Sequence, residues 1–509
     1  MPSPAPSRTM GAPRWPDDVL ADTIDSLDVS AAQAAQQVAS HTSRFASQRV
    51  HFVGIGGVGM SGLAHILADA GATVTGSDPS PSDITEGLTR RGIHVSGVQD
   101  GGLLSKDVDL VVRTAAVADD NAELLAANHH GLETIYYAEL LGQIMAERCG
   151  IAVAGTHGKS TTTAMLAYAL TRCGLDPSFV VGGTVPQLGG GSSSGTGDTF
   201  VAEACEYNRS FLNLAPTVAV ITNIEADHLD TYPGGLNEII ATFAEFAAKL
   251  PPAARGGRLV VSGDDTNVHR LVEENQDDPG KVWRVGKSLG CEWTIVSGGH
   301  QNGLPVGHLL HEGKQVAQLK LKVPGAYNLQ NAAMAVVAAA AVGADVKQAA
   351  EAVSSFRGVD RRQTVVGQVK GSIEGVTVVD DYAHHPTEIR MTLAAVREQF
   401  QPGRVICVFQ PHQASRTRHL LDDFATSFAA ADLVFLPDIY SVRDTPDDQR
   451  FVSSGTLAEH VRSAGGHAEH VKSFEKVADR VRGELQAGDL VVTMGAGDVW
   501  KVGQLLVGA

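Results

Sequence analysis

Two glycine-rich turns constrain the fold of this chain more than any other feature of its sequence. The first, GIGGVG at residues 54–59, ends the β-rich run Val50–Ile55 and precedes the helical run Met60–Ala70. The second, GTHGKS at residues 155–160, lies between the run Ile151–Ala154 and the helical run Thr161–Arg172. Strand, glycine turn and helix in this order are typical of parallel sheets with crossover helices. We therefore expect an α/β fold in which each turn opens its own unit.

The length of the chain and a third alternating segment predict three such units. At about 100–200 residues per domain, 509 residues correspond to three domains. Alternation resumes after Arg362, with strands expected near Val376–Val379, Val405–Phe409, Leu433–Leu436 and Leu490–Thr493. We predict an N-terminal extension over residues 1–46 and domains over residues 47–148, 149–361 and 362–509. The Gly/Ser-rich stretch at residues 189–197 is expected to be a flexible surface loop.

Charge and cysteine usage narrow the class of protein. The formal net charge is −17, which disfavours attraction to nucleic acid or anionic lipid. The five cysteines are scattered without a CxxC pair, which argues against a disulfide scaffold and a structural zinc site. No apolar run is long enough to span a membrane, and the proline-rich start lacks the apolar core of a signal peptide. We expect a cytoplasmic protein; the sequence leaves open whether it forms a homodimer.

The first turn predicts a nucleotide site. Its glycines allow close backbone approach to a pyrophosphate at a helix N-terminus. Asp78 lies about twenty residues further on, after the expected strand Thr73–Gly76, where an acidic residue can bind ribose hydroxyls. A dinucleotide or another nucleoside diphosphate would fit, and the alternative is a purely structural tight turn.

The second turn predicts a triphosphate site. It lacks the first glycine of a standard P-loop, because Val153 stands at that position. The functional half is intact: amides around Gly158 can cradle phosphates, Lys159 can reach the terminal phosphate, and the Ser160 hydroxyl can bind Mg²⁺.

Acidic and imidazole side chains follow other expected strands. Glu203 and Glu206 come after one strand and the segment 223–228 (NIEADH) after another, and their carboxylates suit Mg²⁺. In the third unit, the segments 380–388 and 410–418 are expected to line one substrate cleft. The paired histidines in the first of these could be metal ligands, but their spacing is not that of zinc proteases and no third ligand is evident. Arg416 and Arg418 could hold a carboxylate.

Together, six segments resemble the Mur ligase family. They occur in the family's order from about His51 onward: HFVGIGGVGMSGLA, AGTHGKSTTT, TNIEADHLDTY, DDYAHHPTEI, FQPHQASRTR and MGAGDV. The resemblance implies a Rossmann-like N-terminal domain that binds the UDP end of UDP-N-acetylmuramate. It implies a central P-loop-type ATPase domain with a parallel-rich sheet for ATP and Mg²⁺, and a C-terminal Rossmann-like α/β domain for the amino acid. The fourth and fifth segments favour the reaction that joins L-alanine to the lactyl carboxylate through an acyl phosphate, in peptidoglycan precursor synthesis.

The resemblance also implies roles for individual residues. Catalytic roles fall to Lys159, Glu203, His228, His385 and Arg416. ATP contacts fall to Gly155, Thr156, His157, Gly158, Lys159, Ser160, Thr161, Asn328 and Asp381. Substrate contacts fall to Gly56, Gly57, Gly59, Met60, Ser77, Asp78, Tyr382, His412 and Arg416. Mg²⁺ ligands are Ser160, Glu203 and His228. The chain departs from the family's usual residues at Cys205, Tyr207, Tyr327 and Gln413.

Three alternatives remain at this point. A recycling ligase would attach a preformed peptide to the same UDP-sugar. A nicotinamide-dependent dehydrogenase would use residues 54–59 and Asp78, but it leaves GTHGKS without a role. A non-catalytic nucleotide-binding protein would retain only the fold.

Overall fold

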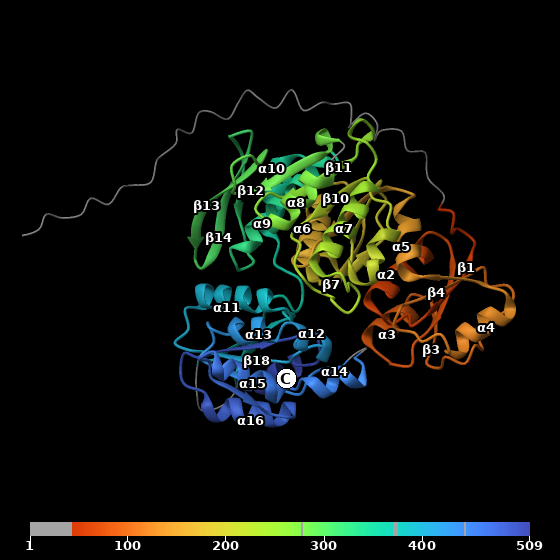
Figure 1. Cartoon of the computed structure of the whole chain (residues 1–509). Helices are drawn as coiled ribbons and strands as arrows, with labels where there is room; N and C mark the ends of the chain where they lie inside the picture. Colours follow the sequence, from red (N-terminus) through yellow and green to blue (C-terminus); the bar gives the residue numbers. More distant parts are fainter. Residues whose placement is uncertain (1–42, 276–277, 370–374, 442–443, 509) are drawn as a thin grey trace, which may run out of the picture. The chain divides into compact units, whose positions relative to one another are not determined.

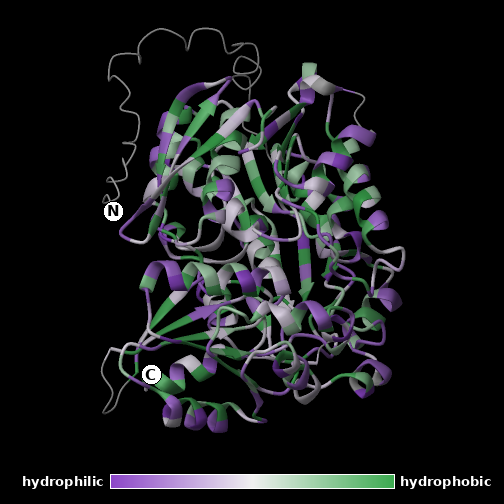
Figure 2. Cartoon of the chain, turned by 60° about the vertical axis from the view of Figure 1, so that its left-hand side comes forward, coloured by the Kyte–Doolittle hydropathy of each residue, from purple (hydrophilic) through white to green (hydrophobic). Residues whose placement is uncertain are grey.

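Each of the three α/β units forms its own sheet with helices against it. The computed structural model describes residues 43–275, 278–369, 375–441 and 444–508 (Figure 1). Most of the predicted extension at residues 1–46 therefore lies outside the described residues. Figure 2 shows hydrophobic residues concentrated in the strands and hydrophilic residues along the outer helices. Within the described ranges, no helix is long and apolar enough to cross a membrane.

The first sheet is fully parallel and has the strand order β3-β2-β1-β4-β5. Its strands are β1 (Arg49–Val53), β2 (Thr73–Ser77), β3 (His94–Ser96), β4 (Leu110–Arg113) and β5 (Glu133–Tyr136). Its helices are α2 (Val58–Asp69), α3 (Asp83–Arg90), α4 (Ala122–His130) and α5 (Tyr137–Met145). The direction of winding reverses at β1, and ligands bind at such a switch point beyond the carboxyl ends of the strands. The first glycine turn lies there.

The second sheet has ten strands in the order β15-β14-β13-β12-β11-β10-β6-β9-β7-β8. Its strands are β6 (Cys149–Ala154), β7 (Ser178–Val185), β8 (Gly190–Ser193), β9 (Thr199–Glu203), β10 (Val218–Ile221), β11 (Arg258–Ser262), β12 (Val282–Gly286), β13 (Trp293–Gln301), β14 (Leu304–His311) and β15 (Lys314–Lys320). Its helices are α6 (Lys159–Arg172), α7 (Gly235–Ala248), α8 (Thr266–Asn275), α9 (Tyr327–Ala341) and α10 (Val346–Ser355). The pairing is parallel around β6 and antiparallel from β13 to β15, so the predicted parallel-rich sheet carries an antiparallel extension.

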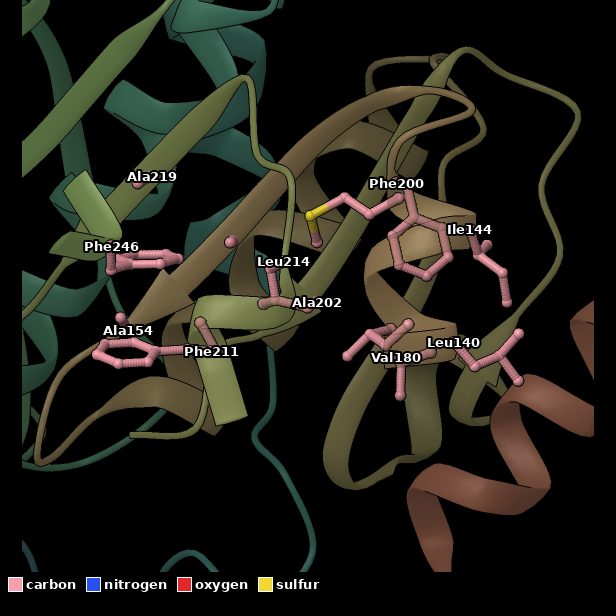
Figure 3. Packing of buried hydrophobic residues seen from close by; sticks show 14 of the residues in the cluster. Leu140, Ile144, Ala154, Val180, Phe200, Ala202, Phe211, Leu214, Ala219 and Phe246 are labelled. Carbon is pink, nitrogen blue, oxygen red and sulfur yellow. The ribbon is translucent and has the colours of Figure 1, made fainter. Parts of the chain in front are cut away.

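Both faces of this sheet are buried. Ile151 and Val153 of β6 pack in a cluster with α6, α9 and α10, whereas Ala152 and Ala154 face a second cluster that contains α7. In the second cluster the ring of Phe211 stacks on Phe246 with centroids 4.8 Å apart (Figure 3). Phe211 belongs to the 3-10 segment Tyr207–Asn213 and is fully buried. This packing anchors the segment that follows Glu203 and Glu206.

The prediction of a flexible loop over residues 189–197 is wrong for its first part. Gly190–Ser193 forms β8, which pairs antiparallel with β7. The rest is held by Arg148, whose guanidinium donates to the carbonyls of Gly195 and Gly197 at 3.0 Å. A Cβ atom at Gly195 would lie 2.1 Å from the carbonyl oxygen of Asp176. The glycines therefore reflect close backbone approach as well as turns.

The third sheet has six strands in the order β16-β17-β21-β18-β19-β20, with β16 antiparallel at the edge. Its strands are β16 (Thr364–Gln368), β17 (Thr377–Asp381), β18 (Val405–Phe409), β19 (Leu433–Leu436), β20 (Ala468–His470) and β21 (Leu490–Met494). Its helices are α11 (Pro386–Phe400), α12 (Ala414–His419), α13 (Leu421–Ser427), α14 (Pro446–Phe451), α15 (Ser454–Ser463), α16 (Phe474–Glu484) and α17 (Trp500–Val507). The four predicted strands are confirmed.

Candidate active site

The second glycine turn has the backbone geometry of a phosphate loop. Gly155 and Gly158 have φ values of 134° and 81°, a region that glycine reaches without strain. A Cβ atom at Gly155 would lie 2.0 Å from the hydroxyl oxygen of Thr222. The helix α6 starts at Lys159 with no side chain capping its N-terminus. Its first backbone N–H groups and the positive end of the helix dipole therefore favour an anion.

Lys159 folds back over this turn. Its ammonium group donates to the carbonyls of Gly155 at 2.5 Å and Thr156 at 3.1 Å, and to Glu206 Oε1 at 3.0 Å. Burial lowers the pKa of Lys159, but the carboxylate of Glu206 outweighs it, and the net pKa is raised. A permanent positive charge therefore sits against the phosphate loop.

The three predicted Mg²⁺ ligands lie around the same turn. The Ser160 hydroxyl accepts a long 3.5 Å contact from Arg362, and Glu203 Oε1 accepts the Gly182 N–H at 2.5 Å. The Nε2 atom of His228 lies 3.9 Å from Glu206 Oε1. A hydroxyl and a carboxylate are oxygen donors of the kind that Mg²⁺ prefers. The imidazole of His228 is a less favoured ligand for Mg²⁺ than these two oxygen donors.

A pocket of about 240 Å³ opens beside the loop. Six of the predicted ATP contacts line it: His157, Gly158, Ser160, Thr161, Asn328 and Asp381. Asn328 donates to the Pro324 carbonyl at 2.6 Å and accepts from Asn331 at 2.9 Å. Asn331 touches the turn itself, because a Cβ atom at Gly158 would lie 2.7 Å from its Oδ1. Asn331 was not predicted individually, although it lies one helical turn after Asn328.

Asp381 forms the C-terminal wall of this pocket. Its carboxylate accepts the N–H groups of Ala383 at 2.7 Å and Gln363 at 2.8 Å. Burial raises the pKa of Asp381 to about 6, against the opposing charge of Arg362. The phenol of Tyr327, at one of the departures, bonds to Gln363 at 2.6 Å. A larger aromatic side chain is thus accommodated through a partner that the sequence did not indicate.

His157 joins the loop to the start of α11. Its Nδ1 lies 3.3 Å from Glu388 Oε1, and its Nε2 lies 3.5 Å from Glu225 Oε2. Burial alone would lower the pKa of His157, but the two carboxylates raise it to about 9. The hydroxyl of Thr387 donates to Glu225 at 2.7 Å. From the sequence, Glu225 was expected only as one of the strand-end carboxylates that suit Mg²⁺, and Glu388 was given no role, because their partner His157 lies far away along the chain.

Tyr382, His412 and Arg416 share one neighbourhood, through His384. The His384 ring lies 5.5 Å from the Tyr382 ring and 6.1 Å from the His412 ring. Burial lowers the pKa of His384 to about 3, so this ring is neutral at physiological pH. The guanidinium of Arg416 contacts His412 Nδ1 at 3.4 Å. The sequence offered His384 as one of two paired histidines that could bind a metal, but did not place it among the amino-acid contacts.

Arg416 also has a carboxylate partner within the chain. It is 7% exposed, and its Nε donates to Asp227 Oδ1 at 3.0 Å. Burial opposes ionisation of Asp227, but Arg416 holds the pKa of that carboxyl well below its usual range. Arg418 instead pairs with Asp448 at 3.1 Å. Of the two arginines, only Arg416 lies beside the predicted amino-acid contacts.

In the first domain, Asp78 closes the glycine turn. Its Oδ2 accepts the Gly56 N–H and its Oδ1 accepts the Ser80 N–H, both at 2.9 Å. A Cβ atom at Gly59 would lie 2.7 Å from the hydroxyl of Tyr137. The predicted contacts Met60 and Ser77 are buried, at 2% and 0% exposure.

The Ser77 hydroxyl takes part in a buried polar group. It donates to Glu123 Oε2 at 2.5 Å, and Gln99 donates to it at 3.2 Å. Glu123 also lies 3.4 Å from His51 Nε2. Sequence reasoning missed Glu123, since a glutamate in the first turn of a helix usually faces solvent.

Three family models match consecutive parts of the chain. The Mur ligase family catalytic domain matches residues 49–148, the Mur ligase middle domain residues 153–339, and the Mur ligase glutamate ligase domain residues 361–497. The UDP-N-acetylmuramate–L-alanine ligase of Clostridium novyi is 42% identical over 466 residues, which cover 91% of this chain and 98% of that enzyme. The chain belongs to the Mur ligase family. The enzyme of the same description from Acetivibrio thermocellus is 40% identical over 464 residues, 90% of this chain and 96% of that one.

Solved structures of Mur ligases share the fold. The UDP-N-acetylmuramate–alanine ligase of Thermotoga maritima superposes with a TM-score of 0.72 at 27% identity, covering 90% of this Mur ligase and 98% of that chain. A murein peptide ligase from Psychrobacter arcticus superposes with a TM-score of 0.66 at 24% identity, covering 91% and 98%. The second likeness concerns the fold alone. The match of all three family models leaves the dehydrogenase alternative without support.

Proposed function

We propose that this Mur ligase joins L-alanine to the lactyl carboxylate of UDP-N-acetylmuramate. ATP is consumed, and UDP-N-acetylmuramoyl-L-alanine, ADP and phosphate are formed, in peptidoglycan precursor synthesis. The observation that carries the proposal is identity of about 40% along nearly the whole length of ligases so described. A cytoplasmic location, expected from the scattered cysteines, belongs to the same proposal.

The phosphate loop supports the first half of the reaction. The lactyl carboxylate attacks the terminal phosphorus of ATP, forming an acyl phosphate and releasing ADP. Lys159 and the N-terminus of α6 supply fixed positive charge where negative charge spreads over the transferred group. His157, raised in pKa by its two carboxylates, adds a second cation at the loop.

Mg²⁺ belongs to this proposal as well. Ser160, Glu203 and His228 would hold it, and bound Mg²⁺ neutralises phosphate charge. The structural support is that the Ser160 hydroxyl and the Glu203 carboxylate lie at the phosphate-loop end of the sheet, at the carboxyl ends of β6 and β9.

The C-terminal neighbourhood supports the second half. The amine of L-alanine attacks the acyl carbon, and the tetrahedral intermediate expels phosphate. A zwitterionic amino acid needs a cation for its carboxylate, and we assign Arg416 to it, with Tyr382 and His412 beside it. Because Arg416 pairs with Asp227, the carboxylate of the incoming amino acid must displace Asp227 from the guanidinium of Arg416.

The proposal is tested by phosphate release from ATP and Mg²⁺ with each substrate left out in turn. Release should require both UDP-N-acetylmuramate and free L-alanine, and the product should be heavier by one alanyl residue. Release with a preformed tripeptide but not with alanine would identify the recycling ligase instead. No release with either acceptor would overturn the ligase assignment.

A further inference from the structure

A cluster of two imidazoles and one carboxylate lies at the mouth of the phosphate loop. His157 comes from the glycine turn, Glu225 from the segment after β10, and His385 from the residue that precedes α11. One potential ligand atom of each lies within 4.8 Å of those of the other two. Glu225 Oε2 is 3.5 Å from His157 Nε2 and 3.9 Å from His385 Nδ1.

Two nitrogens of this cluster have no hydrogen-bond partner. The Nε2 atoms of His157 and His385 are both buried and unpartnered, and His385 as a residue is only 5% exposed. Buried polar atoms are almost always hydrogen-bonded, because leaving one unpaired is costly. The His157 Nε2 faces Glu225 at 3.5 Å without a hydrogen bond, and the His385 ring presents its Nδ1 to the same carboxylate at 3.9 Å while its Nε2 is left unpaired. Two buried nitrogens without hydrogen bonds in one cluster point to a ligand that binds there.

The donor set identifies the class of ligand. Two imidazoles and a carboxylate are the protein ligands of three-coordinate zinc sites that keep a fourth position open. Mg²⁺ prefers an all-oxygen environment, whereas imidazole favours Zn²⁺ and its transition-metal neighbours. We propose that His157, Glu225 and His385 form a Zn²⁺ site that joins the middle domain to the C-terminal domain, and that Zn²⁺ displaces the proton that His157 carries in the metal-free chain.

The geometry requires only small adjustments. With metal–ligand distances near 2.0–2.1 Å, ligand atoms in a tetrahedral site lie about 3.3 Å apart. The pair formed by Glu225 and His157 is close to this separation, and the other atoms must approach by about 0.5–1.5 Å. The hydrogen bond that His385 Nδ1 accepts from the Thr387 N–H is long, at 3.3 Å, so little is lost if the ring turns.

Further contacts already orient the ligands. Glu388 lies 3.3 Å from the Nδ1 atom of His157, on the side of the ring away from Glu225. A carboxylate on the second nitrogen of a metal-bound imidazole holds the ring in place and raises its basicity. The Thr387 hydroxyl holds Glu225 Oε2 at 2.7 Å.

The site would act on nucleotide exchange. His157 and Glu225 line the pocket beside the loop, and His385 precedes the helix whose first residues line the opposite wall. A metal that ties these walls together would restrain their separation. This inference is independent of which acceptor the ligase uses.

Metal binding, rather than activity, is the decisive measurement, because His157 and His385 are themselves assigned to the catalytic machinery. The chelator-treated full chain is titrated with Zn²⁺ against a chromophoric zinc indicator in excess Mg²⁺. We expect one zinc ion per chain at high affinity. His385→Gln and, separately, Glu225→Gln should weaken binding more than about tenfold, since even supporting contacts of a metal site are worth that much.

A matched control is the pair His129 and His130, of which the first is exposed and the second half-buried, with ring centroids 5.4 Å apart. The double variant His129→Gln/His130→Gln should bind zinc like the parent chain. Zinc affinity that is unchanged in both His385→Gln and Glu225→Gln, or lost in the surface variant, overturns the site.

Cobalt gives a second readout that does not depend on affinity alone. Co²⁺ in a tetrahedral site absorbs strongly in the visible region, and the parent chain should show such bands. Folded His385→Gln, with an unchanged melting temperature, should lose them. Identical spectra for the parent and this variant would contradict the assignment of the ligands.

Discussion

The two glycine turns follow the same sequence pattern but differ in the charges around them. Both α2 and α6 begin directly after a glycine and have no side-chain cap. In the first turn the Gly56 N–H is taken by the carboxylate of Asp78, whereas in the second the ammonium of Lys159 covers the loop. The glycines allow a backbone conformation that can bind phosphate, and the neighbouring charged side chains determine whether the phosphate is only bound or also transferred. We therefore assign binding to the first turn and phosphoryl transfer to the second.

Removing Lys159 should give the largest effect. Lys159→Ala removes the ammonium group at the second turn and leaves the first turn unchanged. ATP-dependent phosphate release should therefore fall by about 10³-fold or more. Binding of UDP-N-acetylmuramate, followed by calorimetry, should change little. Lys314→Ala, at an exposed position on β15, is the control and should keep full turnover. Normal phosphate release by Lys159→Ala would show that the two turns do not differ as described.

A methyl group in the first turn should have the next largest effect. The Cβ atom of Gly59→Ala would lie 2.7 Å from the Tyr137 hydroxyl, whereas that of Gly57→Ala meets nothing closer than 3.6 Å. Overpacking of this kind costs about 1–3 kcal/mol. Gly59→Ala should raise the KM for the UDP-sugar about tenfold, with the KM for ATP unchanged, and Gly57→Ala should affect it less. Equal effects of the two variants would argue against the Tyr137 contact.

Asp78→Asn tests the charge of the first turn without changing its shape. An amide can accept only one of the two N–H groups that the carboxylate accepts, so about 1 kcal/mol of support is lost. UDP-sugar affinity should weaken about fivefold, and ATP affinity, measured on the same preparation, should stay constant. A tighter complex with Asp78→Asn would mean that the carboxylate repels the diphosphate more than it supports the turn.

The third glycine-rich stretch should give the smallest effect, and one that depends on pH. Asp176 accepts the N–H of Thr196 at 2.8 Å and its hydroxyl at 2.7 Å. These bonds lower the pKa of Asp176. A lowered folded-state pKa stabilises the chain above the unfolded value of about 3.9, and this contribution is lost as the pH falls through the folded value.

Unfolding by urea should reveal this dependence. Asp176→Asn should lose less than about 1 kcal/mol at pH 7, because the carboxylate is largely exposed. The difference from the parent chain should shrink below about pH 4. Phosphate release should be unaffected at pH 7. A difference that grows on acidification would contradict the sign of the pKa shift.

Local patterns were predictable because they arise from neighbouring residues. The strands on either side of each glycine turn, and the turn itself, follow from alternation and from spacing within about ten residues. The strand β8 was not predicted, because a glycine-rich composition is typical of a loop. Its pairing with β7 and the contacts that Arg148 makes just after it stabilise this strand. The amino-acid composition of a segment does not indicate which other part of the backbone pairs with it.

The partners of the site residues were not predictable for a related reason. Arg416 and Asp227 are 189 residues apart, and His157 and Glu388 are 231 residues apart. Spacing indicated which side chains could carry chemistry but not which charges they meet. Glu123 shows the same limit, since its burial against His51 and Ser77 depends on three separate elements.

If Arg416 holds the carboxylate of the amino acid, as we propose, its ion pair with Asp227 changes the meaning of amino-acid affinity. A guanidinium that is already paired with a carboxylate binds a second carboxylate only by exchange, because the first carboxylate must be displaced. The measured dissociation constant is therefore a ratio of two associations, one with the amino acid and one with the chain's own aspartate. Simple anions compete poorly in such an exchange, since they must displace a tethered rival at high effective concentration. The exchange can thus disfavour other carboxylates of the cell even without any contact to the side chain of the amino acid.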